Sequence, residues 1–225
     1  MENVEKIAYF EELYEYNTED LTENIEYIKQ KKGNLMEIVY GMRDELKTLG
    51  IVEACYKKHY NESKRFFFGA SKMQEWFYKE YNNKQYNIPS GEVTTYSYET
   101  LYFAILSGCK QQRKLMANYL GSFVEEEKEE CNLVNTLLGY SLKYVVLDDT
   151  DNAMKYINQL EESKSKRGIK QFTEGHARAF RGLVQRDEEE FNKGLEFMLR
   201  HHVGRMKRDG RKNNILLMIV WHLLC

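Results

Sequence analysis

Two adjacent histidines, His201 and His202, lie in the basic stretch LRHHVGRMKRDGRK at residues 199–212. Histidines among basic residues suit three kinds of site: a metal centre, a nucleic-acid contact or a catalytic centre. Two metal ligands on one face of a helix need a spacing of three or four residues, and no two of the five histidines have it. Adjacent residues of a helix point about 100° apart. The sequence therefore predicts no metal site at this stretch.

A second pair, Cys55 and His59, is spaced four residues apart in VEACYKKHY, so a helix would place both side chains on one face. A thiolate beside an imidazole is a nucleophile, but a core cysteine beside a surface histidine explains the same spacing. The chain also lacks the Arg-to-His spacing of helical ribonucleases and the motifs G-x-x-x-x-G-K-[ST] and G-x-S-x-G. We therefore expect no catalytic residue, although an active site assembled from distant residues would leave no such motif.

Acidic side chains concentrate in two stretches of the chain. Residues 1–30 hold nine acidic residues against two lysines, which gives a net charge of about −7. The second stretch is EEEKEE at residues 125–130. A strongly acidic surface attracts a basic partner. The candidate partner-binding residues are therefore Glu11, Glu12, Glu15, Glu19, Asp20, Glu23, Glu125, Glu126, Glu127, Glu129 and Glu130.

The basic stretch is the corresponding candidate for binding nucleic acid. It has no interleaved aromatic side chains, and the whole chain carries a net charge of −2. Binding to phosphates requires a positive surface, so the sequence disfavours nucleic acid as a partner. Cations also favour the C-terminal end of a helix. The stretch is therefore predicted to be such a helix end, terminated at Gly204 or Gly210.

The composition predicts a helical protein that stays inside the cell. One proline in 225 residues, Pro89, favours long helices, because proline interrupts helix interiors. Four cysteines without a C-x-x-C pair favour a reducing compartment. The acidic N-terminus lacks signal-peptide character, and the longest apolar run, residues 215–225, is too short to cross a bilayer. We expect a cytoplasmic protein with no membrane contact, cofactor, metal or small-molecule substrate.

Apolar residues recur at helical spacing along most of the chain. In the N-terminal part, Thr18 is predicted to begin a second helix and Asn34 a third, each as an N-cap. Gly50 marks a predicted break in the third helix. Residues 82–99 contain the only proline and a Ser-Gly pair, which predicts a loop with at most a short hairpin or extended segment near 83–98.

The C-terminal part alternates apolar segments with short polar turns. These turns lie at Gly108, at Asp148 with Asp149, and at Arg186 with Asp187, which are 38 to 41 residues apart. Such spacing is typical of stacked helical hairpins. Asp149 and Asp187 are each predicted to cap the helix that follows their turn. An irregular helical bundle would explain the same pattern.

These elements predict an all-α fold, either stacked helical hairpins or an irregular bundle that resembles helical repeats. We expect a single domain over residues 1–225. Within it, residues 1–81 would form an N-terminal helical part, residues 82–99 the loop, and residues 100–225 the helical hairpins.

The segment ARAFRGLVQRDEEEFNKGLEFMLRHH, residues 177–202, resembles the immunity protein 49 family of bacterial antidotes to polymorphic toxins. The resemblance lies in a helix ending in R-G-L-V, a short R-D turn, an acidic helix start, an F-N-x-x-L face and a terminal L-x-H-H. The preceding LLGYSLKYVVLDDTDNAMKYINQLEE, residues 137–162, is similar to the upstream helical hairpin of that family. The resemblance covers residues 100–212, and the N-terminal part matches in helical character only.

The resemblance implies an all-helical, non-enzymatic protein that binds a cognate toxin and blocks it in the producing cell. It supplies no binding residues for this chain, so the acidic candidates above rest on charge alone. Two other functions stay open: a helical-repeat scaffold for an endogenous protein, and nucleic-acid binding through the basic residues 200–212.

Overall fold

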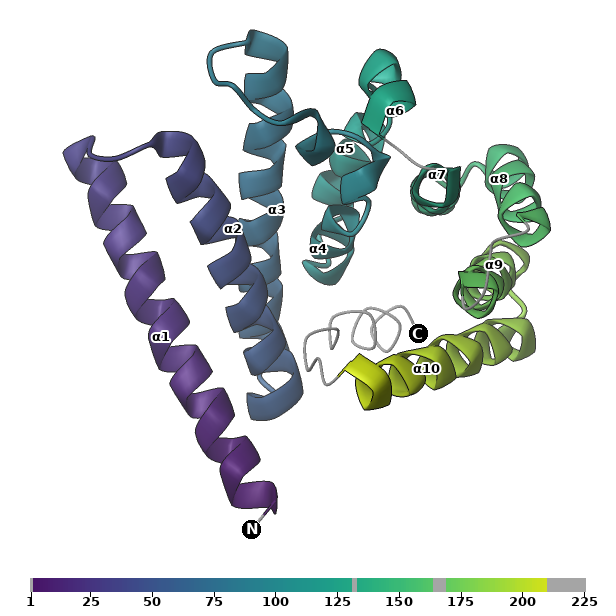
Figure 1. Ribbon diagram of the computed structural model, residues 1–225, viewed down its shortest axis with the longest axis horizontal. Helices are drawn as coiled ribbons and strands as arrows, with labels where there is room; N and C mark the ends of the chain where they lie inside the picture. The colour runs from purple at the N-terminus through teal and green to yellow at the C-terminus, as the bar shows by residue number, and fades with distance from the viewer. Residues whose placement is uncertain (1, 131–132, 164–168, 210–225) are drawn as a thin grey trace. The chain divides into compact units, whose positions relative to one another are not determined.

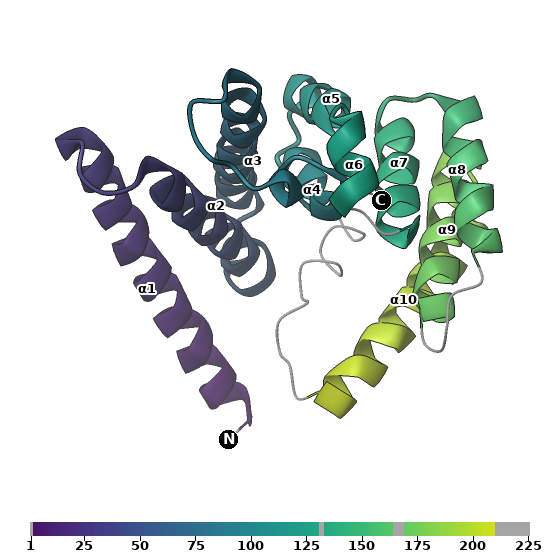
Figure 2. The same ribbon diagram turned by 45° about the horizontal axis from the view of Figure 1, so that its top comes forward.

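The computed structural model describes residues 2–130, 133–163 and 169–209, and it describes side chains in 8–127, 133–163 and 173–201. All regular elements of these residues are helices, as Figures 1 and 2 show. The predicted all-α fold is confirmed.

The single domain expected from the sequence contains two compact units. The first consists of the chain up to Ile88 together with Tyr102–Gln112, and the second consists of Pro89–Leu101 together with the chain from Arg113 onward. The predicted loop is therefore divided between the units. Its second part contains two short 3₁₀ helices, η2 (Ser90–Glu92) and η3 (Thr95–Ser97).

The first unit is built on three long helices. These are α1 (Glu2–Gln30), α2 (Leu35–Val52) and α3 (Tyr60–Asn83), and the π-helix η1 (Glu53–Lys57) joins the last two. α2 packs against both α1 and α3 (Figure 1). The side chain of Asn34 caps α2 by accepting a hydrogen bond from the Met36 N–H at 3.1 Å, which confirms the predicted cap.

Two breaks predicted in these helices are wrong. α1 continues through Thr18, whose hydroxyl donates to the Tyr14 carbonyl at 2.7 Å, a bond that hydroxyl residues form within helices. α2 continues through Gly50, where a Cβ would lie 3.0 Å from Cε1 of Phe67. Gly50 is therefore a packing residue that lets α2 approach α3 closely.

A buried carboxylate, Glu75 of α3, joins this helix to the first turn of α5 (Lys110–Tyr119). Glu75 is 3% exposed and accepts hydrogen bonds from Lys72, Lys79 and Gln112, the last at 3.0 Å. Burial alone would raise the pKa of this carboxyl, but the three donors outweigh burial and lower the pKa to about 2.

Replacing Glu75 with glutamine is expected to destabilise the protein by about 1–2 kcal/mol, because two charge-assisted hydrogen bonds are lost. The pKa of Glu75 is lower in the folded than in the unfolded chain, so its contribution is complete above pH 4.5 and is lost as the pH falls towards 2. Urea unfolding of the wild-type and variant proteins at several pH values measures both effects. Glu62→Gln, an exposed acid of the same helix, is the control, and an equal loss there would contradict the prediction.

The second unit is built mainly from two helical hairpins. α6 (Val124–Glu130) precedes α7 (Leu133–Val146) and α8 (Thr150–Glu162), and α9 (Ile169–Gln185) and α10 (Glu188–Asp209) follow. α8 packs against both α7 and α9, and α10 packs against α9. The remaining helix, α4 (Thr100–Leu106), begins in the second unit and ends in the first.

The two hairpins use the same turn, as predicted. Asp148 and Arg186 adopt positive φ angles of 59° and 56° and end the first helix of each hairpin. Asp149 and Asp187 then accept a hydrogen bond from the backbone N–H three residues further on, at 3.2 Å and 3.0 Å. These side chains cap α8 and α10 at their N-terminal ends.

Candidate partner-binding surface

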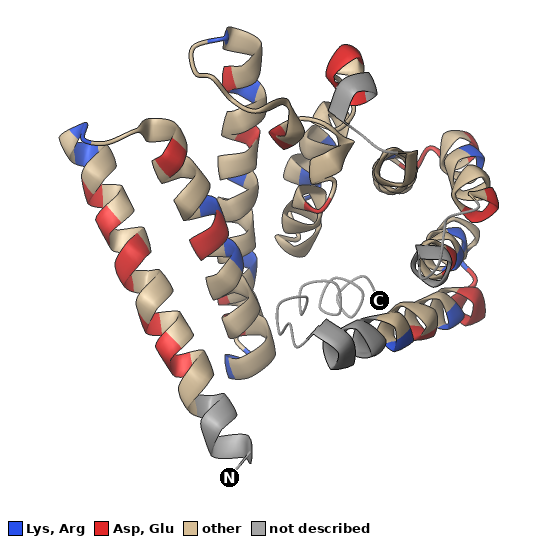
Figure 3. Ribbon diagram, in the orientation of Figure 1, with Lys and Arg blue, Asp and Glu red and all other residues tan. Residues whose placement is uncertain are grey.

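Five acidic residues of α1 lie on the side of the helix that faces away from α2. The buried side of α1 carries Leu13, Asn17 and Leu21, which are buried or half-buried. Residues three, four and seven positions apart share a face of a helix, and this spacing collects the acids on the opposite side. We name this surface the acidic face; it comprises Glu11, Glu12, Glu15, Glu19 and Glu23, all of which are exposed. Figure 3 shows the acidic positions following one another along α1.

Within the described part of the chain, no cation neutralises the negative charge of the acidic face. Among the side chains that the structure describes, none forms an ion pair or a hydrogen bond with Glu12, Glu15 or Glu19. Glu11 accepts a hydrogen bond from a tyrosine hydroxyl at 3.4 Å, and Glu23 accepts one from the Tyr27 hydroxyl. Both donors are uncharged, so this side of α1 presents a net negative surface to solvent.

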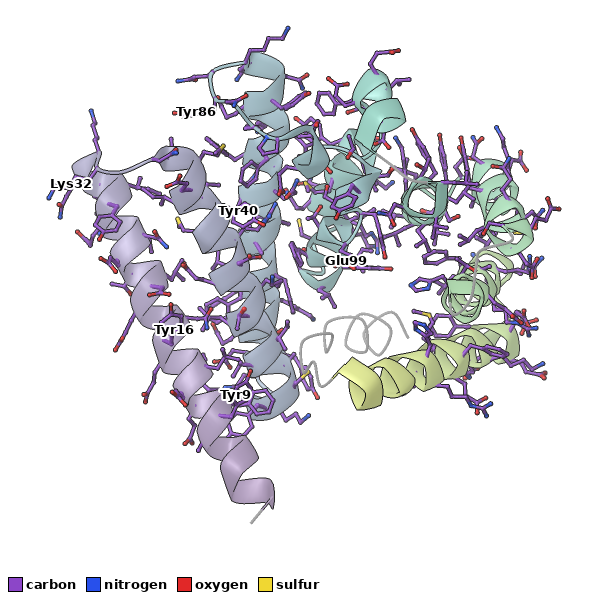
Figure 4. The ribbon with its side chains drawn as sticks, in the orientation of Figure 1. Tyr9, Tyr16, Lys32, Tyr40, Tyr86 and Glu99 are labelled. Atoms are coloured by element: carbon purple, nitrogen blue, oxygen red, sulfur yellow. The ribbon has the colours of Figure 1, made fainter. Side chains whose placement is uncertain are left out.

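Tyrosines follow one edge of the acidic face. Tyr9, Tyr16 and Tyr27 are spaced seven and eleven residues apart, which places them on one line along α1. Their exposed fractions are 43%, 61% and 37%, and Tyr9 and Tyr16 are labelled in Figure 4. Exposed tyrosines are frequent anchors in protein interfaces, because each buries a large area with few rotatable bonds. Charge and aromatic area are thus combined on one helix.

Asp20 lies at the border between α1 and α2 and is half-buried. The Asp20 carboxylate lies close enough to the Tyr16 hydroxyl to raise its pKa. Glu45 of α2 is close enough to Asp20, and to Asp44 of its own helix, for the charges to interact. Glu45 was not among the predicted residues. Glu45 follows Met42 by three residues and precedes Leu49 by four, so it lies on the buried face of α2. An acid at such a position of an apolar helical pattern is a signal that can be found in the sequence.

The second acidic stretch, on α6, does not form a comparable surface. Glu125 is exposed and Glu126 is half-buried, but Glu127 is 7% exposed. Both oxygens of Glu127 bind Thr95, accepting from its backbone N–H at 2.6 Å and from its hydroxyl. Glu127 therefore satisfies the backbone of η3, and its proposed role as a partner contact is wrong. The side chains of Glu129 and Glu130 lie outside the described residues.

The Cys55 and His59 pair does not form an activated thiolate. Burial raises the pKa of the Cys55 thiol, which favours the unreactive protonated form. The His59 ring is held by another group, because its Nδ1 lies 3.0 Å from Oε2 of the buried Glu53. Lys57 binds the other oxygen of the same carboxylate at 3.1 Å. This arrangement stabilises the end of the π-helix.

Most of the basic stretch is outside the described side chains, including His202 and everything after it. The Arg200 guanidinium pairs with Glu196 one turn earlier on α10. α10 continues through Gly204 to Asp209, so the helix end predicted at Gly204 is wrong. Gly210, the other predicted end, lies outside the described residues. No cluster of three His, Cys, Asp or Glu side chains in the described part of the chain is suited to a metal ion.

Within the residues that the structure describes, no helix combines the length and the apolar character needed to cross a membrane. Comparison with known proteins gives no match, whether to protein-family models, to curated proteins or to solved structures. The resemblance to the immunity protein 49 family therefore stays a prediction.

Proposed function

We propose that this protein is a non-enzymatic immunity protein, which neutralises a cognate toxin in the cytoplasm of the producing cell by binding it. The observation that carries the proposal is the acidic face of α1, which is exposed and edged by three exposed tyrosines, and which no cation among the described side chains neutralises. The resemblance of residues 137–162 and 177–202 to the immunity protein 49 family supports the same function.

The charge of the acidic face indicates the kind of toxin. A toxin that acts on nucleic acid must carry a basic surface to bind phosphates. An acidic helix attracts that surface over a distance and occupies the place of the substrate. The exposed tyrosines would then supply the apolar area that holds the complex together, because exposed charge pairs alone contribute little affinity.

Co-expression tests the proposed function. The gene beside the one for this chain is expressed from an inducible promoter, with and without this protein, and survival is scored. We expect the neighbouring product to be lethal alone and harmless in the presence of this protein, and we expect both to purify as a 1:1 complex. A neighbouring product that is harmless, or lethal in both strains, would contradict the proposal. Recovery of a housekeeping protein instead of a toxin would favour an endogenous scaffold.

A further inference from the structure

Glu45 of α2 is buried without a full set of partners. The residue is 8% exposed, and its Oε1 accepts a hydrogen bond from Nδ2 of Asn24 on α1 at 2.8 Å. Its Oε2 is closed to solvent and has no hydrogen-bond partner among the residues that the structure describes. Buried polar atoms are almost always paired, since an unpaired one costs free energy comparable to a lost hydrogen bond. An unpaired carboxylate oxygen at a helix junction therefore indicates a group that binds there.

The surroundings of Glu45 make a cation the expected group. Burial raises the pKa of Glu45, and the charges of Asp20 and Asp44 raise it further, although the hydrogen bond from Asn24 acts in the opposite direction. Lys47, two residues after Glu45, pairs instead with Asp44 at 2.6 Å. Among the described side chains, none supplies a positive charge to Glu45 itself.

The backbone leaves room for this arrangement. At Gly41 of α2, a Cβ would lie 3.3 Å from both Nδ2 of Asn24 and Oε1 of Glu45. Any larger residue at position 41 would therefore press on the hydrogen bond that orients the carboxylate. Tyr16, which is 61% exposed and is labelled in Figure 4, lies close enough to Asp20 and Glu45 for both carboxylates to raise the pKa of its hydroxyl.

We propose that Tyr16, Asp20, Asp44 and Glu45 form an anchor site, between α1 and α2, for one arginine side chain of the protein partner. This inference rests on the proposed function only in taking the partner to be a protein. The anchor site adjoins the tyrosine edge of the acidic face. A basic partner that is attracted by the acidic face would thus place an arginine directly over this junction.

Arginine matches the anchor site better than lysine does. Its planar guanidinium offers five donors in a fixed arrangement, which can bind Oε2 of Glu45 and a neighbouring carboxylate at once. It also stacks on aromatic rings. The same unit already contains such an arrangement, because the Arg43 guanidinium lies 4.5 Å from the centre of the Tyr40 ring. Since Oε2 is closed to solvent in the free protein, a rim side chain must turn aside on binding, and Tyr16 is the most exposed of the four.

The first test uses the stability of the free protein. A Glu45→Gln variant is expected to unfold at pH 7 at a temperature no lower than the wild type, because the raised pKa of Glu45 means that its ionisation destabilises the fold as the pH rises above 4.5. Glu75→Gln, which removes a buried acid with a full set of partners, is the matched control and is expected to lower the unfolding temperature. A loss in Glu45→Gln as large as that in Glu75→Gln would assign Glu45 a structural role and overturn the proposal.

The second test measures binding directly on the full chain labelled with ¹³C-glutamate. Nα-acetyl-arginine amide is expected to shift the carboxyl resonance of Glu45 saturably, with at least tenfold tighter binding than its uncharged isostere, Nα-acetyl-citrulline amide. The Tyr16 ring resonances are expected to respond in the wild type and in Glu37→Gln, an exposed acid of α2, but not in Glu45→Gln. No response, an equal response to citrulline, or a response that survives in Glu45→Gln would overturn the anchor site. The probe is not a toxin, so failure here and failure of the co-expression test are distinguishable.

Discussion

Reversing three charges of the acidic face, in the variant Glu12→Lys, Glu15→Lys and Glu19→Lys, is expected to weaken toxin binding by at least about a hundredfold and to abolish protection. An exposed charge pair contributes about 0.5 kcal/mol, so replacing its attraction by a repulsion of the same size costs about 1 kcal/mol. Three reversals together therefore cost about 3 kcal/mol, which corresponds to about two orders of magnitude in the dissociation constant. These three side chains have no described partner within the protein, so the fold is expected to be unaffected. Calorimetric titration with the purified toxin measures the change.

The matched control reverses three exposed acids on other helices, Glu62 of α3, Glu162 of α8 and Glu196 of α10. This variant changes the net charge by the same amount and is expected to lose two exposed ion pairs, which contribute little stability. Its toxin binding is expected to stay within a few-fold of the wild type. Equal losses of toxin binding in the two variants would show that only the overall charge matters. Unchanged binding in the variant of Glu12, Glu15 and Glu19 would show that α1 is not part of the interface.

Replacing Gly194 of α10 with alanine is expected to destabilise the protein by about 3 kcal/mol or more. A Cβ at this position would lie 2.4 Å from the backbone nitrogen of Ala179 and 2.7 Å from the carbonyl oxygen of Gly175, both on α9. Gly182 of α9 has the reciprocal contact, 2.4 Å from the backbone nitrogen of Phe191 on α10. The two helices touch backbone to backbone, and no flexible side chain can yield. The gain of about 1 kcal/mol from the better helix propensity of alanine does not compensate.

Urea unfolding measures this loss, and Gly91→Ala is the control. At Gly91 the nearest atom to a new Cβ is Cδ1 of Tyr96, 3.9 Å away, and the backbone is not in the left-handed region. The control variant is therefore expected to be as stable as the wild type. A Gly194→Ala protein with unchanged stability would show that α9 and α10 are separated more widely than the structure places them.

Features determined by neighbouring residues in the sequence could be predicted. Asn34, Asp149 and Asp187 were recognised as helix caps because a cap depends on one side chain and a backbone N–H two or three residues away. Gly108, with a φ of 70°, was recognised as the turn between α4 and α5 for the same reason.

Features determined by residues far apart in the sequence could not be predicted. Thr18 and Gly50 have the residue types of a cap and a break, but packing of α1 and α3 against α2 keeps both helices continuous. Glu127 lies in the same acidic run as the exposed Glu125, but it is buried and binds Thr95, which is far away in the sequence. The burial of Glu45 follows from its helical phase in α2, but its hydrogen bond from Asn24 of another helix has no signal in the sequence.

Titration of the purified neighbouring toxin into this protein, at about 50 mM and about 200 mM salt, tests the central claim most directly. The proposed function predicts a 1:1 complex with a dissociation constant of about 10 nM or tighter, which weakens at the higher salt concentration because the acidic face is exposed and screened. It also predicts that the salt dependence is reduced in the triple variant of Glu12, Glu15 and Glu19. The absence of a complex, or an affinity that is the same at both salt concentrations, would contradict it.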